Sequence, residues 1–335
     1  MYNDNIVVEL PDLLKKLPVT ILLNCLSQAD KEKLIKDLGE EFYSVIVQKM
    51  RQESSIIAMR NFHNWIKLTF LKNIADNYKK TKNLALLDIA CGRGGDLIKW
   101  QKANISHVFA FDPSFESIYS DLPDDPGAIS RLKKLKDYNV NVQFELGDAT
   151  QPYGELMTKV NSFLKKINRE SFDLIECNFA LQYFFSSRES LTHVIWFVSM
   201  TLKPGGYFFG TCIDGKKVVK YNNNNPLIEI HKNNDTEYTF TINDIFDKTN
   251  YFTSTGVSKE YIVDFNELES ICSDFGMELV KQNFFERKKN GNGIISFEKI
   301  FPLWKPNNDY TRPITPQEKD LSFMYSVFCF KKKVE

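Results

Sequence analysis

Leu84-Ala85-Leu86-Leu87-Asp88-Ile89-Ala90-Cys91-Gly92-Arg93-Gly94-Gly95-Asp96-Leu97-Ile98-Lys99-Trp100 is the stretch of this chain that decides the fold. An apolar run leads into a glycine-rich turn and then into an amphipathic segment, the order typical of a buried parallel strand, a tight loop and a helix N-terminus. Loops of this kind hold adenosine-containing cofactors at the carboxyl edge of an open α/β sheet, although an ordinary strand-helix turn is the alternative.

The glycine spacing in this loop is not the dinucleotide-binding pattern G-x-G-x-x-G. Asp88 stands just before the glycines, and an acid there suits a cationic ligand that bears an amine better than it suits a pyrophosphate. S-adenosylmethionine has such a head, so we expect it as the cofactor.

Composition sets the class of protein. The 335 residues suffice for one large core with insertions or for two small domains. Lys plus Arg and Asp plus Glu both number 43, which argues against a protein that tracks along RNA through phosphate contacts, but not against recognition of one terminal nucleotide. No apolar run is long enough for a membrane span, and residues 1–12 lack signal-peptide features, so we expect a soluble intracellular protein. The six cysteines form no C-x-x-C pair, which favours buried thiols over a metal site.

Strand-like and helix-like segments alternate through the middle of the chain. The strand-like runs are 84–89, 108–112, 142–146, 172–178 and 207–212, and the helix-like runs are 95–102, 130–138, 153–167 and 187–202. Repeated βα units predict a mostly parallel, doubly wound α/β sheet, with 203–206 as a helix stop and turn. Beyond residue 220 we expect a hairpin (228–231 and 238–242), a helix (266–275) and two strands (278–285 and 324–330).

Polar residues end successive strands, and the carboxyl ends of parallel strands meet at one edge of a sheet. Asp88 would face the methionine amine of the cofactor, Asp112 the ribose hydroxyls, and Asp148 the adenine amino group. Asn178 ends the fourth strand. Any one of these acids taken singly could instead be a helix N-cap.

A second motif, Arg60-Asn61-Phe62-His63-Asn64-Trp65-Ile66-Lys67, lies upstream of the loop. Together the two stretches resemble the mRNA cap guanine-N7 methyltransferases, which carry R-N-F-x-N-W-x-K and then D-x-x-C-G-K-G-G-D-L-x-K-W. Arg93 stands where that family usually has lysine. The resemblance runs from about 55 to 330. It implies a class I methyltransferase fold, Rossmann-like, with a mostly parallel seven-stranded sheet, helices on both faces and an antiparallel last strand.

The resemblance also implies site residues. Lys67 would contact the cofactor carboxylate, and the cofactor set is Lys67, Asp88, Ala90, Gly92, Asp112, Asp148, Asn178 and Tyr183. Glu260, in E-Y-x-V-x-F, would accept the N1 and N2 donors of guanine, with a solvated surface acid as its alternative. The cap set is His63, Asn64, Arg93, Gln182, Tyr183, Glu260 and Tyr325, in which Gln182 replaces a family histidine and Tyr325 would close over the cap. Arg93 and Lys99 could meet the triphosphate.

These residues predict transfer of a methyl group from S-adenosylmethionine to N7 of a GpppN cap. The N7 lone pair is free at neutral pH, so we expect substrate-orienting residues and no catalytic base, nucleophile or metal. The rival hypotheses are a methyltransferase for small molecules or proteins, and an inactive scaffold that binds capping partners.

The chain divides into a helical arm or the end of an upstream module (1–50) and a methyltransferase domain (51–335) with a cap-side insert at about 220–258. Capped mRNA and other capping-enzyme domains or subunits are the expected partners, with no membrane. The lysine- and asparagine-rich composition resembles capping proteins of large DNA viruses. Host cytoplasm is the expected location for a viral protein and the nucleus for a cellular one.

Overall fold

The computed structural model describes residues 33, 54, 56–78, 83–122, 125–151, 154–242, 257–288, 291–306 and 312–334. The predicted helical arm over 1–50 lies outside this range apart from Lys33. None of the described helices is both long and apolar enough to cross a bilayer.

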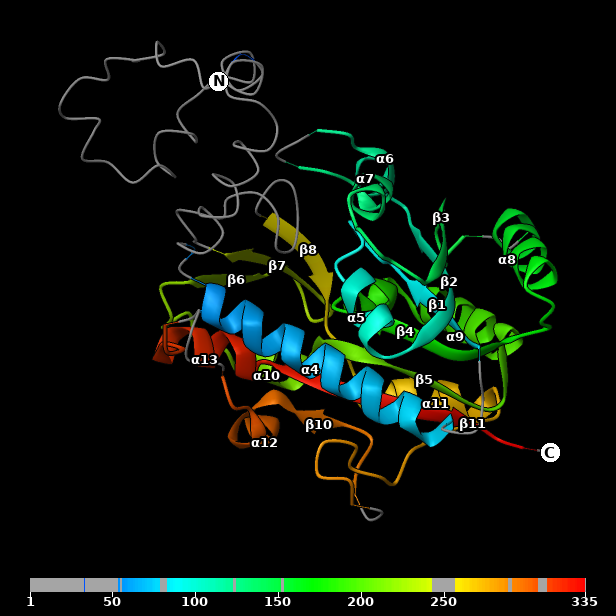
Figure 1. Cartoon of the computed structure of the whole chain (residues 1–335). Helices are drawn as coiled ribbons and strands as arrows, with labels where there is room; N and C mark the ends of the chain where they lie inside the picture. The colour runs from blue at the N-terminus through cyan, green and yellow to red at the C-terminus, as the bar shows by residue number, and fades with distance from the viewer. Residues whose placement is uncertain are drawn as a thin grey trace, which may run out of the picture.

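A mostly parallel sheet organises the described chain, in the order β10-β11-β5-β4-β1-β2-β3 (Figure 1). Its parallel strands are β1 (Leu84–Ile89), β2 (Ile105–Asp112), β3 (Asn141–Leu146), β4 (Phe172–Asn178) and β5 (Leu202–Ile213). The last strand, β11 (Tyr325–Lys332), runs antiparallel to β5, as predicted. The sheet has eight strands, not seven, because β9 (Met277–Leu279) and β10 (Ile295–Ser296) both pair with β11. The α/β class is confirmed.

Helices cover both faces of this sheet. On one face lie α4 (Ile57–Ala75), α5 (Leu97–Lys102), α12 (Phe297–Ile300) and α13 (Pro316–Phe323), whose apolar side chains form one core cluster. On the other face lie α8 (Gly154–Lys166), α9 (Arg188–Thr201) and α11 (Phe265–Asp274), which form a second cluster. The shorter elements are η2 (Asp76–Tyr78), α6 (Phe115–Tyr119), α7 (Ala128–Lys133), η3 (Leu181–Ser186), α10 (Gly215–Lys220) and η4 (Phe301–Leu303). The doubly wound layering follows from strands that are buried on both faces.

Three predicted boundaries are wrong. The helix expected over 130–138 begins at Ala128 and ends at Lys133. Residues 203–206 lie inside β5, because Leu202 already pairs with Phe172 while Tyr207 pairs with Leu174, so the intervening residues bulge out of the ladder. Gly205 takes φ +76° there. The strand expected over 278–285 ends at Leu279. The chain turns soon afterwards, where the Asn283 side chain accepts hydrogen bonds from the backbone of Phe285 and Glu286.

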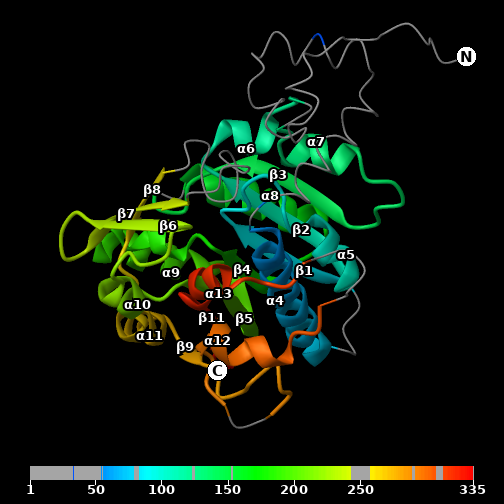
Figure 2. The same ribbon diagram turned by 90° about the vertical axis from the view of Figure 1, so that its left-hand side faces the viewer.

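A separate three-stranded antiparallel sheet follows α10. The predicted hairpin is confirmed as β6 (Ile228–Lys232) and β7 (Glu237–Ile242), and β8 (Val257–Tyr261) adds a strand that the sequence did not reveal. Figure 2 shows these strands as a layer of their own beside the main sheet. The Tyr183 hydroxyl in η3 bonds to the Ser258 hydroxyl in β8 at 2.8 Å. The small sheet therefore meets the segment that leaves the carboxyl end of β4.

Candidate active site

The glycine-rich loop after β1 leaves open space beside its backbone. Ala90 and Gly92 both have positive φ, +58° and +52°, which turns the chain sharply out of the sheet and is unfavourable for alanine. Apart from atoms of the adjoining residues, no atom lies within 4 Å of the point where a Cβ would stand on Gly92 or Gly95. A ligand can therefore approach this backbone closely, as a cofactor-binding loop requires.

Asp112 ends β2 and fixes this loop. Its Oδ2 accepts the Gly92 N–H at 2.8 Å, and its Oδ1 accepts the Ser114 N–H at 2.9 Å. Burial raises the pKa of Asp112, although these backbone bonds and Arg93 oppose the rise. A carboxylate offers about four acceptor positions, so Asp112 retains capacity for hydroxyl donors of a ligand.

Asp148 and Asn178, two of the other predicted strand-end residues, follow or end the strands on either side of β1 and β2. Asp148 follows Gly147, whose N–H bonds to the Asp112 carbonyl at 3.1 Å, and its Oδ1 accepts from the backbone N–H and hydroxyl of Thr150. Asn178 ends β4 and donates to Glu176 Oε2 at 3.3 Å. The structure thus brings Asp112, Asp148 and Asn178 to one edge of the sheet.

Lys67 lies on α4, and its side chain reaches this edge of the sheet. Its ammonium contacts Asp96 Oδ1 at 2.7 Å, and Lys99 contacts the same oxygen at 2.9 Å. Burial alone would raise the pKa of Asp96, but the two ammonium groups outweigh it and hold that pKa well below its usual range. Lys99 also donates to the Gly95 carbonyl and is 9% exposed. The Lys99 ammonium is thus turned toward Asp96 and the glycine loop, and its predicted contact with a triphosphate stays a prediction.

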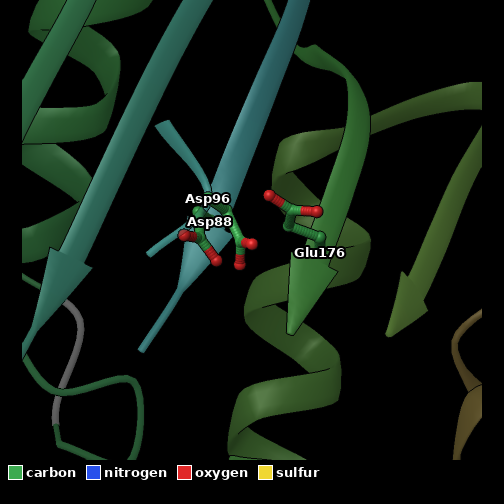
Figure 3. A group of neighbouring side chains, drawn as sticks. All are labelled: Asp88, Asp96 and Glu176. Carbon is green, nitrogen blue, oxygen red and sulfur yellow. The ribbon is translucent and has the colours of Figure 1, made fainter. Parts of the chain in front are cut away.

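Three buried acids gather behind the loop (Figure 3). Asp88, Asp96 and Glu176 each place a carboxylate oxygen within 4.8 Å of the others. Asp88 and Glu176 are register partners on neighbouring strands, and Glu176 accepts the Trp100 indole N–H at 2.6 Å. Burial raises the pKa of Glu176 to about 7 and that of Asp88 well above its usual value.

A second polar cluster joins η3 to the small sheet. Glu260 is 1% exposed, and its Oε2 accepts the hydroxyl of its cross-strand partner Tyr238 at 2.6 Å. Tyr183 lies 3.5 Å from Glu260 Oε1. Burial raises the pKa of Glu260, while hydrogen bonds from Tyr238, Ser258, Gln182 and Tyr183 oppose the rise. Glu260 is therefore not the solvated surface acid of the alternative interpretation.

His63 and Tyr325 pack inside the molecule. Both are 1% exposed, and their rings lie 5.6 Å apart at 62°. Phe179 stacks on His63 at 5.2 Å, and the His63 Nε2 lies 2.6 Å from the Ser322 hydroxyl. Both residues pack in the core of this structure, and their predicted cap contacts stay predictions, because Glu260 of the same cap set is equally buried. Asn64, one position along α4, is exposed.

Arg93 connects the glycine loop to the segment before α7. Its guanidinium donates to the carbonyls of Glu116 and Asp125, and it pairs with the Asp125 carboxylate at 2.6 Å. A contact with cap phosphates would have to compete with these partners. The predicted phosphate contact of Arg93 stays a prediction.

The family follows from the sequence match over this whole region. Residues 27–333 match the model of the mRNA (guanine-N(7))-methyltransferase domain. The chain belongs to this family. The resemblance seen in the two motifs is thereby confirmed.

Curated relatives carry the same description. The mRNA cap guanine-N(7) methyltransferase of Eremothecium gossypii is 29% identical over 320 residues, which cover 84% of this chain and 66% of the relative. That of Drosophila melanogaster is 27% identical over 260 residues, 71% of this chain and 57% of the relative. That of Saccharomyces cerevisiae is 27% identical over 325 residues, 90% and 70% respectively. The chain thus spans slightly less than two thirds of the first relative and still less of the second.

Within this guanine-N7 methyltransferase domain, four polar residues stand at the site without a role assigned from sequence: Asp96, Glu176, Tyr238 and Ser258. Glu176 carried a usable signal, because an acid inside an apolar strand is either paired or protonated. Asp96 directly follows the glycines. Tyr238 and Ser258 gave no signal, since their importance depends on which residues face them across the small sheet.

The buried imidazole of His63 makes the stability of the domain sensitive to acid. Burial, aided by Lys67, lowers the pKa of His63 to about 3. The unfolded chain binds this proton near pH 6.5, so stability is complete above that pH and falls as the pH drops toward 3. Between pH 7 and pH 5 we expect a loss of roughly 2 kcal/mol from this residue. Urea unfolding of wild type and His63→Gln at both pH values measures it, and equal losses in the two proteins would contradict the assignment.

Proposed function

We propose that this domain transfers the methyl group of S-adenosylmethionine to N7 of the terminal guanosine of a GpppN mRNA cap. The observation that carries the proposal is the position of Tyr183. This residue follows β4, which ends at the edge of the sheet where the cofactor would bind. Its hydroxyl lies against Ser258 and Glu260 of the small sheet. One side chain thus joins the two clusters that a methyl donor and a guanine base would occupy.

The residues at the sheet edge suit S-adenosylmethionine by their chemistry. Asp112 supplies acceptors for two ribose hydroxyls, and Lys67 supplies an ammonium for the methionine carboxylate. The backbone at Ala90 and Gly92 borders the open space beside the loop. Asp88 and Asn178 complete the methionine side, and Asp148 the adenine side. When bound, the cofactor supplies an electrophilic methyl group on a sulfonium.

Glu260 suits the guanine edge. A carboxylate accepts from N1–H and N2–H together, a pair of donors that no other base presents. Four side chains already donate to Glu260, so guanine would take over the acceptor positions now used by Tyr183 and Gln182. Tyr183 is then free to stack on the purine or bond its edge. The described strands of the predicted insert at about 220–258, with the rest of β8, would form the cap side of the domain, and exposed Asn64 would be a further cap contact.

Catalysis in this proposal depends on position and not on proton transfer. The N7 lone pair attacks the methyl carbon directly, and the positive charge moves from sulfur to the base. Holding the two reactants in line is worth roughly 7 to 11 kcal/mol of the barrier. The acids near the cofactor and Glu260 near the base provide a field that suits this movement of charge. Such an enzyme acts on capped mRNA inside the cell, with other capping domains or subunits as further partners.

Methyl transfer from labelled S-adenosylmethionine tests the proposal. The acceptors are GpppA-capped RNA, free GTP and uncapped RNA, and nuclease digestion of the product locates the label. We expect label at N7 of the cap guanine and none in uncapped RNA. Equal labelling of uncapped RNA, or labelling of a protein instead, would favour the rival methyltransferase. Failure to bind the cofactor would favour the inactive scaffold.

A further inference from the structure

The acid cluster behind the loop holds more carboxyl groups than cations. Within the described part of the chain, Asp88, Asp96 and Glu176 share the ammonium groups of Lys67 and Lys99, and both of these bond to Asp96. Glu176 has neutral donors, the Trp100 indole and the Asn178 amide. Two adjacent buried carboxyl groups without a cation of their own do not both ionise. The Asp88–Glu176 pair therefore retains a proton.

The groups around Glu176 allow the pair to lose this proton near neutral pH. Burial and the charge of Asp96 raise the pKa of Glu176 to about 7, against the opposing effects of Trp100, Lys67 and Lys99. For Asp88, burial, Glu176, Asp96 and Asp112 all raise the pKa, and Lys67 opposes them. The proton therefore belongs to the pair and not to either residue alone.

The methyl donor and its product differ in charge. S-adenosylmethionine has a sulfonium, an ammonium and a carboxylate, whereas the product left after transfer has a neutral sulfur. A cation that enters the edge of the sheet favours the ionised form of a neighbouring carboxyl, and by linkage the ionised form favours the cation. The neutral-sulfur product gains less from the same ionisation.

We propose that the Asp88–Glu176 pair releases a proton when the methyl donor binds, so that the domain selects the cationic donor over its product more strongly as the pH rises through neutrality. This inference rests on the proposed cofactor and adds a pH-dependent preference for the methyl donor over its product. Glu176 is a positioning residue in this scheme, because it acts through charge and through the Asn178 amide. Product inhibition would accordingly weaken in mildly alkaline solution.

Isothermal titration calorimetry of the full chain with S-adenosylmethionine and with S-adenosylhomocysteine tests the inference. Between pH 6 and pH 8 we expect the ratio of the two dissociation constants to shift about tenfold in favour of the methyl donor. Titrations at pH 7 in two buffers of different ionisation enthalpy should show more proton release with S-adenosylmethionine than with S-adenosylhomocysteine. Both ligands carry an amine that titrates by itself, so a protein variant is needed to isolate the pocket.

Glu176→Gln is that variant, since its amide oxygen still accepts from Trp100, although its NH₂ group no longer accepts from the Asn178 amide. It should flatten the pH dependence of the ratio and reduce the proton release. Glu170→Gln makes the same chemical change at an exposed position just before β4 and should behave as wild type. Tight binding with a pH-independent ratio in wild type would overturn the inference and leave the cofactor assignment standing. Failure of both ligands to bind at any pH would overturn the cofactor assignment and the inference together.

Discussion

Glu260→Gln should raise the concentration of capped RNA needed for half-maximal methyl transfer by about 100-fold, while leaving the affinity for S-adenosylmethionine within about twofold. Each hydrogen bond to a charged acceptor is worth roughly 1.5 to 3 kcal/mol, and tenfold in affinity is about 1.4 kcal/mol. The variant loses the negative charge and replaces one acceptor oxygen with an NH₂ group, which meets the guanine donors with a donor of its own. The Tyr238 hydroxyl can still bond to the remaining oxygen.

The control for this change is Glu229→Gln. Glu229 lies on β6 of the same small sheet, is exposed and pairs with His231. It should leave both parameters unchanged. Steady-state kinetics with GpppA-capped RNA separates KM from kcat, and thermal unfolding confirms that both variants are folded. An equal rise in KM for the cap and for S-adenosylmethionine would remove Glu260 from the guanine-binding role.

The parallel half of the fold could be predicted from sequence because most of its strands contain short apolar runs that alternate with helix-like segments. β2 ends at Asp112 and β4 at Asn178, as expected, and the order of strand and helix segments was right. The antiparallel elements were harder. β8 is five residues long and reads Val-Ser-Lys-Glu-Tyr, in which only the inward positions Ser258 and Glu260 are fully buried. A strand whose buried positions are polar does not show the alternating hydrophobicity by which strands are recognised in a sequence.

The partners of the site residues could not be predicted, because they come from distant parts of the chain. His63 meets Ser322 across 259 positions, and Lys67 meets Asp96 across 29. Motif resemblance predicts Lys67 as a ligand for a cofactor, but it does not predict the Asp96 carboxylate that Lys67 contacts in the structure. Packing of α13 against α4 likewise decides that His63 is enclosed and that its neighbour Asn64 is exposed.

Asp112→Asn should weaken binding of S-adenosylmethionine by at least about 100-fold, the second large effect that we expect. The carboxylate has two tasks, since it holds the Gly92 and Ser114 backbone and in our proposal accepts both ribose hydroxyls. The amide replaces one acceptor with a donor and removes the charge, so at least two charge-assisted hydrogen bonds of roughly 1.5 to 3 kcal/mol each are affected. Asp121→Asn, an exposed acid beyond α6, should bind the cofactor as wild type does.

A ligand without ribose hydroxyls separates the two tasks of Asp112. Calorimetry compares S-adenosylhomocysteine with its 2′,3′-dideoxy analogue in wild type and in Asp112→Asn. If Asp112 binds the ribose, removal of the hydroxyls costs wild type much of its affinity and costs the variant little, because the interacting carboxylate is already gone. Equal losses in the two proteins would mean that Asp112 acts only through the glycine loop. Binding of the ribose would then belong to another group at this edge of the sheet.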